Sequence, residues 1–129
     1  MVRVLAYVWA APTTAVGVLF VLLGWASGGR WQVVEGVLEI HGGLVTWLLR
    51  HATVLPGGAA AMTLGHVVLG CDRDALERTR RHERVHVAQC ERWGPAFLPA
   101  YLLASLWQWV RGRDAYRDNP FEREAYERG

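Results

Sequence analysis

Residues 74–95 read DALERTRRHERVHVAQCERWGP and carry the clearest start and stop signals in the chain. Asp74 is a suitable N-cap, and Glu77, three residues later, completes a capping-box pattern. Gly94 followed by Pro95 marks the end, because glycine accepts a left-handed backbone and proline cannot continue a helix. The stretch therefore predicts a helix of about five turns.

The middle of this predicted helix carries the motif H-E-x-x-H at residues 82–86. His82 and His86 lie on one helical face, so both imidazoles can bind one Zn²⁺. Glu83 is offset around the helix and reaches a water on the metal rather than the metal itself. The motif predicts two zinc ligands and Glu83 as the general base of a hydrolase. The alternative is a pair of solvated or ion-paired histidines among the neighbouring arginines.

A third ligand is needed, because a catalytic zinc ion usually has three protein ligands and one open position. The candidates are Glu122 and Glu124, in the segment NPFEREAY at residues 119–126. Asn119 as N-cap and Pro120 as the first helical residue predict a short helix there. Glu122 stands three residues after Asn119, so it can instead be a capping-box partner. Glu124 can simply be solvated.

H-E-x-x-H followed by a helix with E-x-x-A resembles the gluzincin zinc metallopeptidases. The likeness is to small membrane-associated members, such as the prenyl-protein (CAAX) protease and heat-shock membrane protease group. In that family the first glutamate of the downstream helix is the third zinc ligand, and by resemblance this role falls to Glu122. Tyr126 replaces the family's aspartate, which supports a zinc histidine. The similarity covers about residues 74–126 and extends to minimal gluzincin-like bacterial proteins.

The resemblance implies two further features of the site. Gluzincins place an edge strand just before the zinc helix, where a peptide binds by strand addition, and residues 62–69 are in that position. A donor to the oxyanion is also expected, and Tyr116 is the first choice, with Tyr126 and His66 behind it. The alternative for Tyr116 is an ordinary packed aromatic side chain.

The two cysteines, Cys71 and Cys90, do not make a disulfide framework and favour a reducing compartment. Cys90 lies four residues after His86, near the face of the two histidines. A thiolate there would be a fourth ligand that closes the site and makes the zinc structural. The alternative is a small buried apolar residue. Cys71 has no assigned role.

Residues 4–26 contain no charged side chain. A helix of this length spans the roughly 30 Å hydrocarbon core of a bilayer. Trp9 and Trp25 lie near its ends, as interfacial aromatic residues do. We predict a single-pass membrane anchor over residues 1–28, with a buried core helix or a cleaved secretory signal as alternatives. The unpaired cysteines favour a cytoplasmic catalytic domain at a bacterial inner membrane.

The rest of the chain, residues 29–129, is predicted to form one minimal gluzincin-like domain. Trp31 to Ile40 reads as a hairpin around Glu35-Gly36, residues 61–69 read as another strand, and residues 44–50 read as a short helix or loop. Pro56-Gly57-Gly58 reads as a turn. Residues 96–110 are apolar and predict a helix, either at a membrane interface or in the core.

The expected fold class is α+β, with an N-terminal transmembrane helix, a small antiparallel sheet, a zinc-binding active-site helix and C-terminal helices. Hydrophobic residues make up 52% of the 129 residues, which excludes a disordered chain. The formal net charge of +2 argues against a nucleic-acid partner.

These features predict a membrane-anchored zinc metallopeptidase whose substrate is a peptide or protein near the membrane. His82, His86 and Glu122 would bind Zn²⁺, Glu83 would be the general base, and Tyr116 would assist at the oxyanion. The second hypothesis is a catalytically inactive zinc protein with a structural or interaction role. The third is a metal-free protein whose arginine-rich helix contacts anionic lipid.

Overall fold

The computed structural model describes residues 2–51 and 59–129, with side chains from residue 4 onward. Its elements, in chain order, are α1 (Val2–Ala26), β1 (Arg30–Val34), β2 (Val37–His41), α2 (Gly43–His51), β3 (Ala61–Leu64), β4 (Val67–Gly70), α3 (Arg73–Trp93), the 3₁₀ turn η1 (Gly94–Ala96), α4 (Phe97–Val110) and α5 (Pro120–Arg128). The α+β class is confirmed. The turn predicted at Pro56-Gly57-Gly58 lies outside the described residues.

The four strands form one sheet in the order β1-β2-β4-β3. β1 and β2 form the predicted hairpin, with Trp31 opposite Ile40. The sheet is mixed, so the prediction of an antiparallel sheet is wrong at its centre: β2 and β4 pair in parallel. The reason is the path of the chain: α2 follows β2 and leads into the edge strand β3, which runs in the direction opposite to β2, and the turn after β3 then brings β4 back beside β2 in the same direction as β2.

Residues 61–69 form two strands rather than the single predicted strand. β3 and β4 pair antiparallel around a tight turn at Gly65 and His66. Gly65 has φ +65°, a left-handed backbone that favours glycine, and a Cβ there would meet Thr14 of α1 at 2.3 Å. The turn leaves β3 at the edge of the sheet, beside α3.

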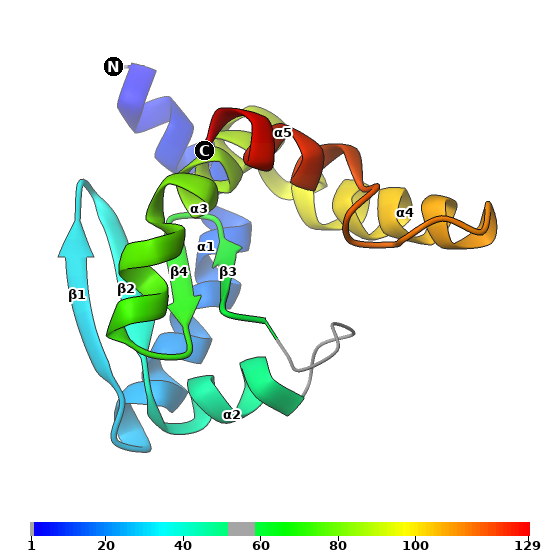
Figure 1. Ribbon diagram of the computed structural model, residues 1–129. Helices are drawn as coiled ribbons and strands as arrows, with labels where there is room; N and C mark the ends of the chain where they lie inside the picture. Colours follow the sequence, from blue (N-terminus) through cyan, green and yellow to red (C-terminus); the bar gives the residue numbers. More distant parts are fainter. Residues whose placement is uncertain (1, 52–58) are drawn as a thin grey trace.

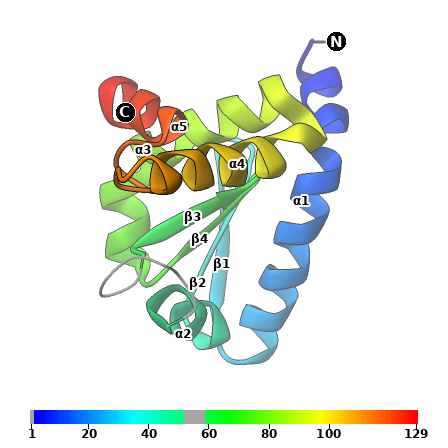
Figure 2. The same ribbon diagram turned by 90° about the vertical axis from the view of Figure 1, so that its right-hand side faces the viewer.

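Helices cover both faces of the sheet (Figures 1 and 2). In Figure 1, α3 lies in front of the sheet and α1 lies behind it. On the α1 side, Val21 packs in one apolar cluster with Ile40 and Leu69. On the α3 side, Leu76 and Val87 pack with strand residues in a second cluster. The second cluster packs the H-E-x-x-H helix against the sheet, and the first packs α1 against the opposite face.

The α3 helix begins earlier than predicted. Its N-cap is Asp72, whose carboxylate accepts a hydrogen bond from Ala75 N at 2.7 Å. The capping box predicted for Asp74 and Glu77 is therefore wrong, because Asp74 is already in the first helical turn, where it pairs with Arg78. The predicted end is confirmed: Gly94 caps α3 with φ +59°.

One helix, α1, is long and apolar enough to cross a membrane, a property that a soluble core helix or a signal sequence shares. Ala10, Thr13 and Val21 of α1 are buried. A Cβ on Gly17 would lie 2.7 Å from Val67 Cβ, so only glycine fits at this approach. The division predicted between residues 1–28 and 29–129 thus separates a helix from the sheet on which it packs.

The α4 helix extends sideways beyond β3 (Figure 1). Of its 14 residues only Phe97 and Gln108 are buried. Its large apolar side chains are mostly exposed, among them Leu102, Leu103 and Trp109. A core position for residues 96–110 is therefore wrong. The helix stands beside the body of the protein rather than inside it.

Candidate metal centre

Two helices bring three potential metal ligands together. His82 and His86 lie on α3, and Glu122 lies on the first turn of α5. The Nε2 atoms of His82 and His86 are each 3.0 Å from Glu122 Oε1. All three ligand atoms lie within 4.8 Å of one another. Ligand atoms around a tetrahedral zinc ion with bonds of about 2.0–2.2 Å lie about 3.3 Å apart, so the donor set fits zinc in both type and spacing.

Gln89 fixes the proton position on His86. The Gln89 amide nitrogen donates to Glu124 Oε1 at 2.7 Å and to the carbonyl oxygen of Phe121 at 3.0 Å. Both partners only accept, so the amide oxygen must be the atom that faces His86 Nδ1 at 2.8 Å. His86 Nδ1 therefore carries hydrogen, and in the neutral imidazole the lone pair lies on Nε2.

That lone pair points at the carboxylate of Glu122. Two acceptors 3.0 Å apart repel one another unless a proton or a metal cation neutralises the contact. Burial lowers the pKa of His86, but the hydrogen bond and charge of Glu122 raise it above its usual value overall. Burial raises the pKa of Glu122, but hydrogen bonds from His82 and His86 lower it to about 2. The site favours positive charge at the point where the three ligands meet.

Glu83 lies beside this point. Its Oε2 is 3.8 Å from His82 Nε2, and its Oε1 is 3.1 Å from the hydroxyl of Thr63 on β3. The side chain is buried, and burial raises the pKa of Glu83, a shift only partly offset by the charges of His86 and His82. A carboxylate in this position can accept a proton without being one of the three candidate metal ligands.

Tyr101 of α4 donates a short hydrogen bond to the second carboxylate oxygen of Glu122. Asn119, the N-cap of α5, donates to the Tyr101 carbonyl oxygen at 3.1 Å and to Ser105 Oγ at 2.7 Å. The capping-box alternative for Glu122 fails, because its carboxylate contacts His82, His86 and Tyr101. α4 therefore supports Glu122 in two ways. Tyr101 donates to the Glu122 carboxylate, and Tyr101 and Ser105 accept hydrogen bonds from Asn119, the N-cap of the helix that carries Glu122.

The remaining predicted residues are placed as follows. Tyr116 lies near the site, but its hydroxyl contacts Tyr126 Oη at 2.9 Å. Tyr126, which replaces the aspartate of the resembled family, packs its ring against His82, with 4.4 Å between ring centroids. His66 lies elsewhere, 2.7 Å from Glu91 and stacked on Tyr7 of α1. It is not part of the site.

Glu124 and Cys90 do not join the three ligands. Glu124 accepts hydrogen bonds from Gln89 and from Arg92 and Arg128, so it is not simply solvated. Cys90 is fully buried beside Ala10 and Phe97. Burial raises the pKa of the Cys90 thiol to about 12, which keeps it protonated. Cys71 and Cys90 are both free, as predicted.

The site opens into a groove of about 1200 Å³. Edge strand β3 forms one wall and α4 forms the opposite wall, with α3 and α5 between them. His82, Glu83, His86 and Glu122 all line this groove, and so does Tyr116. A ligand in the groove can therefore reach the three ligand atoms and Glu83.

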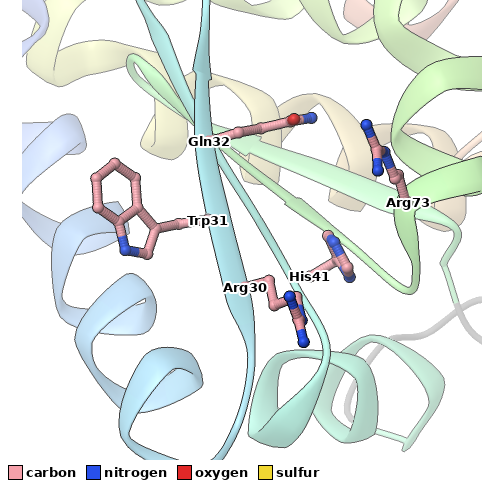
Figure 3. Close-up of a pocket in the computed structure, with 5 residues that line it drawn as sticks. All are labelled: Arg30, Trp31, Gln32, His41 and Arg73. Carbon is pink, nitrogen blue, oxygen red and sulfur yellow. The ribbon is translucent and has the colours of Figure 1, made fainter.

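A smaller hollow of about 160 Å³ lies at the other end of the sheet (Figure 3). It is lined by Arg30, Trp31, Gln32, His41 and Arg73. Figure 3 shows Trp31 directed away from Gln32, to the opposite side of β1. With a single histidine and no carboxylate, this hollow has no set of metal ligands. His41 lines this hollow and is not one of the three ligands of the candidate centre.

Three supporting residues were not singled out from the sequence: Thr63, Gln89 and Tyr101. Gln89 could have been found, because it lies three residues after His86 on the same helical face. Thr63 and Tyr101 reach the site only through the tertiary fold, and no spacing in the chain indicates them.

The chain matches no protein-family model, no curated protein and no solved structure. Any assignment of function therefore depends on the geometry of the site.

Proposed function

We propose that this protein is a zinc-dependent peptidase of the gluzincin type. The observation that carries the proposal is the convergence of His82 Nε2, His86 Nε2 and Glu122 Oε1 within 4.8 Å, inside an open groove. The Gln89 contact supports it, because it leaves the Nε2 lone pair of His86 free for a metal. Glu83 lies beside the three ligands without being one of them.

Zinc bound there would polarise the substrate carbonyl and lower the pKa of a water toward 7. Glu83 takes a proton from the attacking water at its carboxylate and delivers it to the amide nitrogen that leaves. Thr63 holds Glu83 in position with a hydrogen bond of 3.1 Å. Tyr116 lines the same groove and stays the predicted donor to the oxyanion.

The proposed place of action is a membrane surface. α1 exposes large apolar side chains along its outer face, among them Leu5, Leu19 and Leu22. A single-pass topology with a cytoplasmic catalytic domain requires α1 to leave the sheet, or the sheet to enter the hydrocarbon. The packing of α1 favours a helix that lies along the bilayer with only its outer face in lipid.

The first experiment measures zinc per chain in detergent-purified wild type and His82→Ala, followed by peptide hydrolysis by wild type and Glu83→Gln. We expect about one zinc ion per chain, lost in His82→Ala. Glu83→Gln should keep zinc and lower hydrolysis by about 10²–10⁴-fold. Equal turnover by Glu83→Gln would remove Glu83 as the base. Bound zinc without any hydrolysis would favour a structural or interaction role.

A second comparison tests the third ligand. Glu122→Ala should weaken zinc binding strongly, because it removes a ligand atom. Glu124→Ala should weaken it far less, since Glu124 contacts only Gln89 and arginines. Competition with a chelator of known affinity measures both variants. The reverse order would show that the other carboxylate binds the metal.

A further inference from the structure

The groove beside the candidate centre has two unlike walls. One wall comes from residues 59–64, three alanines followed by Met62, Thr63 and Leu64, and includes edge strand β3. The other wall is the apolar face of α4, which presents Leu98, Leu102, Leu106 and Trp109 at helical spacing. The ligand residues and Glu83 lie between these walls.

We propose that this groove binds an extended polypeptide segment rich in apolar side chains, selected by the α4 wall. The inference rests on the proposed function, because it names the substrate class of the same site. It adds a specificity determinant that the H-E-x-x-H motif does not contain, namely Leu102 and Leu106.

The β3 wall can bind the backbone of such a segment. β3 is the last strand in the sheet order, and within residues 2–51 and 59–129 no strand pairs with its outer side. An extended chain can add there through main-chain hydrogen bonds. Residues 59–64 would accommodate a segment about 20 Å long at 3.3 Å per residue.

The α4 wall provides for apolar side chains. Leu102 is 64% exposed and Leu106 is 53% exposed, so both retain surface that a ligand can bury. The two charged residues of the lining outside the centre are already paired. Arg78 lies 2.8 Å from Asp74, and Asp114 accepts hydrogen bonds from the backbone nitrogens of Tyr116 and Arg117. The groove therefore offers a charged substrate side chain little opposite charge outside the candidate centre with which it could pair.

The opposite face of α4 supplies a matched control. Leu103, Trp107 and Val110 lie on that face and do not line the groove. Leu103 is 66% exposed and Leu106 is 53% exposed. Substitutions at Leu103 and Leu106 therefore change exposed leucines on one helix but only one of them faces the proposed ligand.

The test uses full-length Glu83→Gln protein with zinc, so that binding is measured without turnover. Fluorescence anisotropy compares a labelled peptide of leucine, valine and alanine with a peptide of equal length made of serine, glutamine and glutamate. We expect the apolar peptide to bind at least about tenfold more tightly. Adding Leu106→Arg should weaken its binding at least about tenfold, and adding Leu103→Arg should leave it unchanged. Leu106→Ser serves as a milder variant, with melting temperature and zinc content as controls for folding.

Equal affinity for both peptides, or equal effects of Leu103→Arg and Leu106→Arg, would overturn the inference. So would a labelled fatty acid that occupies the groove and that the apolar peptide does not displace. Hydrolysis by the wild-type protein separates the two proposals. If the apolar peptide binds tightly but is not cleaved, the proposed peptidase activity is contradicted and the proposed apolar specificity of the groove is supported. If both peptides are cleaved equally, the peptidase activity is supported and the apolar specificity is contradicted.

Discussion

Gln89 decides which nitrogen of His86 faces the candidate centre. Its own two donor contacts, to Glu124 and to the Phe121 carbonyl, leave its oxygen no other direction. Partners of this kind orient metal ligands and raise their basicity. The Gln89 contact supports His86 from within α3, whereas the resembled family uses an aspartate at the position that Tyr126 occupies here.

We expect Gln89→Met to weaken zinc binding by about 10–100-fold, because methionine keeps the volume but accepts hydrogen bonds poorly. Chelator competition measures the affinity, and the melting temperature checks the fold. Cys90→Ala is the control, since Cys90 is equally buried and its side chain packs with Ala10 and Phe97. Unchanged affinity in Gln89→Met would show that His86 needs no such partner.

At the residue scale, spacing in the sequence locates a cap or a metal ligand only to within one helical turn. The histidine pair and Asn119 as N-cap follow directly from spacing and residue type. The choices between Asp72 and Asp74, and between Glu122 and Glu124, do not. Each pair is two residues apart, and only the direction of the side chains in the folded chain separates them.

α1 binds the sheet through its small residues, so its shape on that side matters more than its hydrophobicity. A side chain on Gly17 would press on Val67 and on the Leu64 carbonyl oxygen, 2.9 Å away. We expect Gly17→Val to lower the free energy of unfolding by about 1–3 kcal/mol. Chemical denaturation in detergent measures the change. Ala15→Val, at an exposed position two residues earlier, should cost much less. Equal costs would mean that α1 does not pack as described.

Glu39 ties β2 to α3. It is fully buried and accepts hydrogen bonds from Arg80 at 2.9 Å, Arg84 at 3.1 Å and Gln32 at 3.0 Å. Burial raises the pKa of Glu39, but Arg80, Gln32 and Arg84 lower it below its ordinary value of 4.5. The folded protein therefore takes up this proton less readily than the unfolded chain does.

The stability that Glu39 contributes is present above about pH 4.5 and is lost as the pH falls through the lower folded-state pKa. Glu39→Gln should be less stable at pH 7 by about 3 kcal/mol, because it leaves the partly buried Arg80 and Arg84 without their carboxylate partner. It should also lose less stability than wild type between pH 7 and pH 3. Glu77→Gln, at an exposed helix position, should behave like wild type. A parallel acid profile for Glu39→Gln and wild type would contradict the assignment.

The individual elements were largely predictable, and their pairing was not. The β1–β2 hairpin follows from two β-branched runs around Glu35-Gly36. The parallel pairing of β2 with β4 depends on the path through α2, which no local pattern reveals. The separate strands β3 and β4 depend on the turn at Gly65, inside what reads as one continuous apolar run.

At the scale of the whole molecule, α1 and α4 carry most of the exposed large apolar side chains of the described chain. If α1 lies along a membrane while packed on the sheet, alkaline carbonate should extract wild-type protein from membranes. Leu19→Arg, on the outer face of α1, should weaken membrane binding without changing the melting temperature. Trp47→Arg, at a similarly exposed position on α2, is the control. Resistance to carbonate would indicate a spanning helix that has left the sheet.

The long-range contacts of α1 also bear on how the protein is made. Trp9 donates a hydrogen bond to the Arg92 carbonyl oxygen, 83 residues later in the chain. At about 5–20 residues per second, Trp9 is synthesised about 4–17 s before that partner. Until residues 61–70 have been synthesised, strands β3 and β4, which cover Gly17 of α1, do not exist. If the proposed membrane association holds, targeting to the membrane and folding of the domain compete for the same helix, and the order of synthesis gives targeting the first opportunity.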